Sequence, residues 1–115
     1  MVIELPWPPK ELSPNARVHW ATKARKAKEY RAECRLLTLI AGVSAPEGRS
    51  VLALEFVAPD RRPRDDDNLV AAFKSGRDGI AEALGVDDRQ FVTEFRMSES
   101  THKGGMVKVT IREAL

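Results

Sequence analysis

Acidic residues that could bind a metal ion occur in two short groups. Asp65, Asp66 and Asp67 stand in a row, and Asp87 and Asp88 follow about one helix length later. Carboxylate oxygens without nearby cysteine or histidine favour Mg²⁺, with Mn²⁺ as the alternative. If Asp65, Asp67 and Asp88 converge, they need a counter-ion, and Asp87 is a further candidate ligand. Magnesium held in this way could polarise a phosphodiester and activate an attacking water.

Basic residues directly precede the first acidic group. Arg61, Arg62 and Arg64 present planar guanidinium groups that suit phosphate contacts, which position a nucleic acid without reading its sequence. Lys74 falls on the same side of the following segment as Asp67 and is a candidate for neutralising charge on the phosphate. Asp78, four residues after Lys74, is most simply its ion-pair partner.

A second basic surface is expected from the segment 22–41. Its polar face has six basic residues, Lys23 and Lys26 among them, and only two acids. A solvated helix face and a phosphate-binding face are equally supported by this pattern. Lys103, in a polar connection near the end of the chain, completes the candidate DNA-binding residues. Residues 1–64 contain twelve Lys and Arg against seven Asp and Glu, and the remainder seven against ten, so the basic half and the acidic half differ.

The hydrophobic periodicity places these residues between strands and helices. Alternating or continuous apolar runs predict strands over 2–5, 51–57, 91–97 and 106–112. The run 51–57 suits a central strand buried on both faces, and the last two strands are close enough to pair as a hairpin. Spacings of three and four predict helices over 22–41 and 68–84, the second one capped near Asp67. The expected fold is a single α/β (α+β) domain, with a mixed sheet, two helices and the order β-α-β-α-β-β.

The two helices have apolar stripes that should face the core. In 22–41 the stripe is Ala27, Tyr30, Cys34, Leu37 and Ala41, widened by Leu36 and Ile40. In 68–84 it is Leu69, Phe73, Gly76, Ile80 and Leu84. The rigid segment 6–9, Pro-Trp-Pro-Pro, is expected to leave the first strand with its tryptophan anchored on the core.

Composition excludes several classes of protein. The 115 residues suffice for one domain but not two, and 31% of them are charged. The lone Cys34 cannot form an internal disulfide, so a small buried hydrophobe in a reducing, cytoplasmic protein is expected. A secretory leader and a long apolar run are both missing, which argues against secretion and membrane spanning. No Ser/His/Asp or Cys/His grouping, phosphate-binding glycine loop or zinc-binding set stands out.

Three motifs together resemble a known family. Leu5-Pro6-Trp7-Pro8-Pro9 opens the chain, the run 59–69 reads PDRRPRDDDNL, and Asp87-Asp88-Arg89-Gln90 follows the second helix. Over nearly its whole length the chain resembles the RusA family of Holliday junction resolvases. The resemblance implies a single endonuclease domain over 1–115, and a homodimeric, magnesium-dependent enzyme that cuts four-way DNA junctions in recombination and repair, often encoded by prophages.

Site roles follow from the resemblance position by position. It implies that Asp65, Asp67 and Asp88 are the catalytic, metal-binding aspartates, and that Asp87 matches the acid before the last of them. Ala71 stands where one branch of the family has a functional lysine, and Lys74 is the candidate replacement. Asp66 stands at a position that is usually apolar, and the interval to the second acidic pair is slightly longer.

Two alternatives share most of these residues. One is a metal-dependent nuclease that acts on other branched or single-stranded DNA. The other is a DNA-binding module without catalytic activity, whose acids are only helix caps and surface charge.

Overall fold

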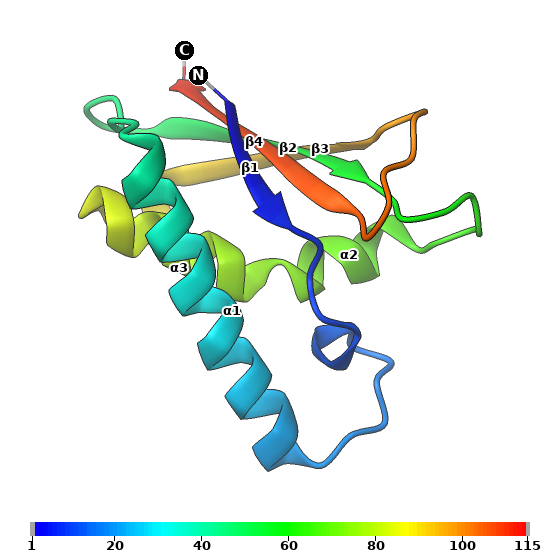
Figure 1. The fold of residues 1–115 in the computed structure, drawn as a ribbon. Coiled ribbons are helices and arrows are strands. Elements are labelled where there is room, and N and C mark those ends of the chain that lie inside the picture. The colour runs from blue at the N-terminus through cyan, green and yellow to red at the C-terminus, as the bar shows by residue number, and fades with distance from the viewer. Residues whose placement is uncertain (1, 115) are drawn as a thin grey trace.

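The computed structural model describes residues 2–114 as a four-stranded sheet with three α-helices below one of its faces (Figure 1). The strands are β1 (Val2–Pro6), β2 (Ser50–Val57), β3 (Phe91–Met97) and β4 (Met106–Glu113). The helices are α1 (Trp20–Ala41), α2 (Asp66–Ala72) and α3 (Lys74–Leu84), with short 3₁₀ turns η1 (Lys10–Leu12) and η2 (Asp88–Gln90). The predicted α+β class and mixed sheet are confirmed.

The sheet has the order β1-β4-β2-β3, so the predicted hairpin of the last two strands is wrong. β3 pairs with β2 in parallel, and β4 lies between β1 and β2, antiparallel to both. The connection 98–105 passes the end of β2, where the amides of Ser98 and His102 donate to the carbonyls of Phe56 and Ala58. A connection of this length can cross one strand, because neighbouring strands are only about 4.8 Å apart.

The second predicted helix is two helices, so the expected number of helices is also wrong. α2 ends at Ala72 and α3 begins at Lys74, and the amide of Phe73 between them donates to the carbonyls of Leu69 and Val70. The apolar stripe nevertheless continues across the break. Phe73, Gly76 and Ile80 are buried, and Leu69 and Leu84 pack against the same core, as predicted.

The core lies between the sheet and the helices. Leu52, Leu54 and Phe56 of β2 point toward the helices and meet Tyr30 and Phe73. The rings of Phe56 and Phe73 meet edge to face at 6.2 Å, a preferred aromatic geometry. Further core side chains come from β1 and β4: Ile3, Leu5, Val107 and Val109. Burial of these groups is what fixes the helices against the sheet.

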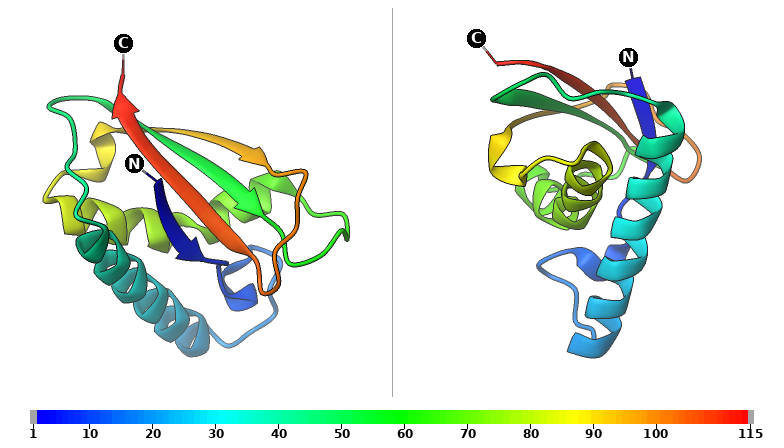
Figure 2. Two further views of the ribbon diagram at one scale, coloured as in Figure 1. Left: turned by 45° about the horizontal axis from the view of Figure 1, so that its top comes forward. Right: turned by 90° about the vertical axis from the view of Figure 1, so that its left-hand side faces the viewer.

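α1 confirms part of its predicted stripe and corrects the rest. Tyr30 and Cys34 are buried, and Cys34 has no exposed surface. Leu36 and Ile40 do not widen this stripe, because they are 56% and 71% exposed. α1 packs on one side only, and Figure 2 shows its opposite side with no other element over it. Successive residues lie 100° apart around a helix, so Leu36 can face the open side while its neighbour Leu37 packs against the core.

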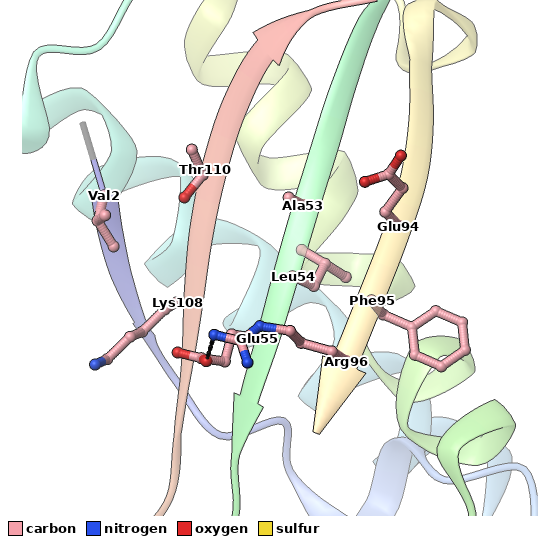
Figure 3. Close-up of a pocket in the computed structure, with 9 residues that line it drawn as sticks. All are labelled: Val2, Ala53, Leu54, Glu55, Glu94, Phe95, Arg96, Lys108 and Thr110. Atoms are coloured by element: carbon pink, nitrogen blue, oxygen red, sulfur yellow. Dashed lines mark ion pairs between the residues drawn. The ribbon is translucent and has the colours of Figure 1, made fainter. Parts of the chain in front are cut away.

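Within residues 2–114 no helix covers the face of the sheet away from α1 to α3, yet no residue of β2 is exposed, so its predicted burial on both faces is confirmed, with Ala53 and Glu55 half-buried. Figure 3 shows Glu55 of β2 on this face between Arg96 and Lys108 of the neighbouring strands. Glu55 forms an ion pair with Arg96. Val51 is only 8% exposed there, and Glu94 and Arg112 of the neighbouring strands line the same hollow. The apolar character of β2 thus comes from its central place in the sheet.

Within residues 2–114 no helix is long and apolar enough to cross a membrane.

Candidate functional site

The first acidic group forms the beginning of α2. Asp65 is the N-cap, and its Oδ1 accepts hydrogen bonds from the amides of Asp67 at 2.9 Å and Asn68 at 3.2 Å. Asp66 and Asp67 lie in the first helical turn, so the helix starts two residues before the predicted Asn68 and the cap is Asp65 instead of Asp67. A cap with two amide donors is favourable for an aspartate and complements the helix dipole.

Arg64 holds the loop between β2 and α2. Its Nη1 donates to the carbonyls of Asp60 and Arg62, both at 2.9 Å, and its Nη2 donates to the Asp60 carboxylate at 2.8 Å. Its side chain is only 18% exposed, and its guanidinium lies 5.7 Å from the centre of the Trp7 ring. Arg64 was predicted to bind a phosphate, but most of its hydrogen-bonding capacity is spent inside the protein.

The other two arginines of this loop face solvent. Arg61 is exposed, and the Arg62 side chain is 80% exposed while it pairs with Asp60 at 3.0 Å. Hydrogen bonds from Arg62, with a further one from Arg64, hold the pKa of the Asp60 carboxyl well below its usual range. The three arginines and the segment 97–101 line one groove, which lies at the same edge of the sheet as Asp65. Lys103 belongs to the same exposed connection.

The second acidic group lies at the opposite ends of the strands, beside the beginning of β2. Phe91, which directly follows η2, pairs with Ser50 at the beginning of β2, whereas Asp65 follows the end of β2. Because β2 has eight residues, its two ends are separated by roughly 20 Å. Figure 1 accordingly shows α2 and the chain after α3 at opposite ends of the helical layer. A parallel strand pair requires this crossover, since the connecting helices must return the chain to the starting edge.

Local contacts also occupy the second acidic group. Arg77 donates to the carboxylate of Asp88 at 3.4 Å and to the carbonyls of Asp88 and Phe91 at 3.0 Å. Asp87 caps η2 and pairs with Arg89 at 2.8 Å, and hydrogen bonds from Arg89 hold the pKa of Asp87 well below its usual range.

A single chain therefore does not gather the predicted metal ligands. Asp65 and Asp67 are neighbours at α2, but Asp87 and Asp88 do not join them, because the crossover separates the two sheet edges. In the part of the chain from residue 2 to 114, no group of three or more His, Cys, Asp or Glu side chains is placed to hold a metal ion.

The lysine candidates are spread over the molecule. Lys74 begins α3, remains exposed and pairs with Asp78 at 3.4 Å, as predicted for an i, i+4 partner. Lys26 pairs with Glu29 at 3.9 Å, and Lys23 donates to the carbonyl of Ser13 at 3.4 Å. Lys23 and Lys26 lie in the first two turns of α1, and Ser13, the partner of Lys23, lines a pocket together with Arg64 and Asp65.

Two features, one beside each acidic group, were missed from the sequence. The first is Arg77, which fastens the beginning of β3 to α3; a charged residue four positions after Phe73, within an apolar stripe, was a signal of such a role. The second is a pocket beside Asp65 with Trp7 in its wall. Trp7 meets Phe56 edge to face at 6.1 Å, which confirms the aromatic anchor predicted for the segment 6–9.

Comparison with other proteins identifies a close relative. The chain matches no protein-family model. It is 45% identical over 113 residues to an uncharacterized protein of Xylella fastidiosa (strain Temecula1), and the match covers 95% of this chain and 74% of that protein.

Proposed function

The chain belongs to the same family as the Xylella fastidiosa protein, and we propose that it is a magnesium-dependent, structure-selective DNA endonuclease. It resolves four-way junctions by paired phosphodiester hydrolysis, in DNA recombination and repair. The motifs that resemble the RusA family support this proposal, and the lone, buried Cys34 is consistent with action in the cytoplasm.

The observation that supports it most is the composition of one sheet edge. Carboxylates at the beginning of α2 lie on the same edge as the exposed Arg61, Arg62 and Lys103. Guanidinium and ammonium groups attract the DNA backbone, and carboxylates alone would repel it. Carboxylates and basic groups at the same strand ends are expected where a phosphodiester is bound and cut.

Asp65 and Asp67 fit a magnesium ion, which proteins often hold through one or two carboxylates while the substrate phosphate supplies further oxygens. Among the described residues, the hydrogen bonds to the Asp65 carboxylate use only Oδ1. When bound, magnesium supplies a polarised phosphodiester and a water of lowered pKa. Asp88 is not part of this pair within one chain, and the proposal assigns no step to it.

The test is a pair of charge-matched variants. Asp67→Asn is expected to abolish cleavage of a four-way junction while the affinity for that junction stays the same or rises, since one negative charge is lost. Glu99→Gln removes one negative charge from the exposed connection at the same edge and should leave cleavage intact. Normal cleavage by Asp67→Asn would remove Asp67 from the proposed site.

We further propose that the active form is a two-fold dimer joined through α1. Leu36, Leu39 and Ile40 are 56%, 47% and 71% exposed and gather on the open side of α1. Exposed aliphatic groups concentrated in this way mark an interaction surface. The same open side has exposed charges of both signs beside the apolar groups, Lys28 and Glu33, so a second copy can pair opposite charges at the rim of this surface. Two opposed incisions also require two sites.

Leu36→Glu tests the dimer. The introduced carboxylate would be buried against an apolar partner, so sedimentation should detect a monomer at concentrations where the wild type is dimeric. Val92→Glu is the matched control, because Val92 is 37% exposed on a different surface, the open face of the sheet. Dissociation by Val92→Glu and not by Leu36→Glu would transfer the interface from α1 to the sheet.

A non-catalytic DNA-binding module is the second candidate. It is favoured by the contacts that already occupy the acids, because Asp65 caps α2 and Asp88 accepts from Arg77. This alternative predicts salt-sensitive junction binding with no nicking at any magnesium concentration.

A further inference from the structure

The pocket beside Asp65 has the composition of a small aromatic-ring site. Trp7 and the two prolines after it form one wall, and Leu69 and Ala72 of α2 form another. Its volume is about 230 Å³, which is below the 300 Å³ or so at which sites for larger ligands begin. The pocket therefore suits a single ring system.

The aromatic wall is fixed before any ligand arrives. Trp7 meets Phe56 edge to face on one side, and the Arg64 guanidinium lies 5.7 Å from the centre of its ring. Gly105 packs directly against it, since a side-chain carbon at Gly105 would lie 2.9 Å from three Trp7 atoms. Binding to a wall that is already ordered has little entropic cost.

The polar groups of the pocket match the edge of a nucleobase. Asn68 presents a side-chain amide, in which a donor and an acceptor stand side by side. Paired donors and acceptors of this kind recognise adenine through two parallel hydrogen bonds. Lys10 is exposed at the rim and can approach the phosphate attached to the same nucleotide.

We propose that this pocket binds one unstacked nucleobase of the DNA, beside the phosphodiester that is cut. The inference rests on the proposed nuclease function, because Asp65 belongs both to the pocket and to the proposed cleavage site. Removing a base from a duplex stack is unfavourable, and least so where the base is already unpaired. A base pocket next to the carboxylates thus gives a physical reason for preferring branched DNA over plain duplex.

The first experiment measures base binding without cleavage. A tetranucleotide of deoxyadenosine is titrated into the 115-residue chain without Mg²⁺, and the Trp7 indole and Asn68 amide resonances are followed by NMR. The comparison ligand is an abasic tetranucleotide with the same phosphates. The base-containing ligand should shift both resonances, whereas the backbone amide of Gln90, which lies in η2 at the opposite ends of the strands, should not move. Equal shifts with the abasic ligand, or none with either, would overturn the inference.

Two variants connect the binding to the pocket. Ala72→Leu fills it and is expected to weaken tetranucleotide binding about tenfold, the scale of one base–aromatic stacking contact. Ala71→Leu, one residue away on the exposed side of α2, should bind like the wild type. Asn68→Leu removes the amide and should also weaken binding. Because Asn68 is half-exposed, this variant should fold even if the substitution at the buried Ala72 prevents folding. Unchanged binding by folded Ala72→Leu and Asn68→Leu would place the base elsewhere.

Cleavage is measured separately, so the two proposals can fail separately. Base binding in the pocket without magnesium-dependent cleavage would refute the nuclease and leave a nucleic-acid-binding pocket. Cleavage without any base-dependent shift of Trp7 or Asn68 would refute the pocket and leave the nuclease.

Discussion

Gly79 of α3 packs directly against the backbone of α1, and alanine there should destabilise the protein. A side-chain carbon at Gly79 would overlap the backbone carbonyl oxygen of Arg31 and lie 3.0 Å from the amide nitrogen of Arg35. Backbone atoms of α1 cannot move aside as a side chain can, so α1 and α3 must separate. Overpacking of this kind costs about 3 kcal/mol at the upper end of its usual range.

Helix propensity works in the opposite direction at Gly79. Alanine is favoured over glycine inside a helix by about 1 kcal/mol, which leaves a net loss of about 2 kcal/mol in the free energy of unfolding. For a domain of this size the melting temperature should fall by about 8 °C. Thermal unfolding followed by circular dichroism measures this directly.

Gly85→Ala is the matched control for Gly79→Ala. Gly85 ends α3 with φ +68°, and a side-chain carbon at this position would have no neighbouring atom within 4 Å. The substitution therefore carries only the conformational cost of about 1 kcal/mol. A melting temperature of Gly79→Ala at or above that of the wild type would show that propensity dominates, and would refute the close packing of α1 on α3.

Two further predictions concern ionisable groups. Burial raises the pKa of the Cys34 thiol to about 12, so at pH 8 iodoacetamide should modify Cys34 only after denaturant is added. Mass spectrometry measures the modification. Rapid labelling of the native protein would contradict the burial of Cys34. The pKa of Asp60 is lowered by its hydrogen bonds with Arg62, so its contribution to stability is complete above its unfolded pKa of about 3.9 and is lost as the pH falls through the folded value. Carboxyl NMR should find Asp60 still ionised below pH 3, and an ordinary titration midpoint would contradict the contact with Arg62.

The strands and helices were predicted well, because the spacing of apolar residues along the chain reflects which side of each element is buried. Strand and helix positions followed from apolar spacing, and the stripe from Leu69 to Leu84 was correct even across the break at Phe73. The break itself was not visible, because Phe73 satisfies the same periodicity in one helix or in two. Leu36 was misassigned because periodicity cannot tell which of two apolar sides faces the core.

Contacts between distant segments were the part that sequence could not supply. The hairpin prediction failed because spacing alone cannot distinguish direct pairing from a connection that crosses β2. The predicted meeting of Asp88 with Asp65 failed within one chain for a related reason, since it depended on which end of a returning strand lies near α2. Arg64 was expected to contact DNA phosphates. Its hydrogen bonds with Asp60 depend on the folded conformation of the loop, which the sequence pattern does not specify.

The most direct test of the proposed function is a cleavage assay that compares a mobile four-way junction, a flap and a plain duplex, each with and without Mg²⁺. The proposal predicts paired, symmetric incisions that are confined to the junction and require the metal. Equal cutting of flaps would indicate a broader nuclease. Binding of the junction with no magnesium-dependent incision in any substrate would contradict the central claim.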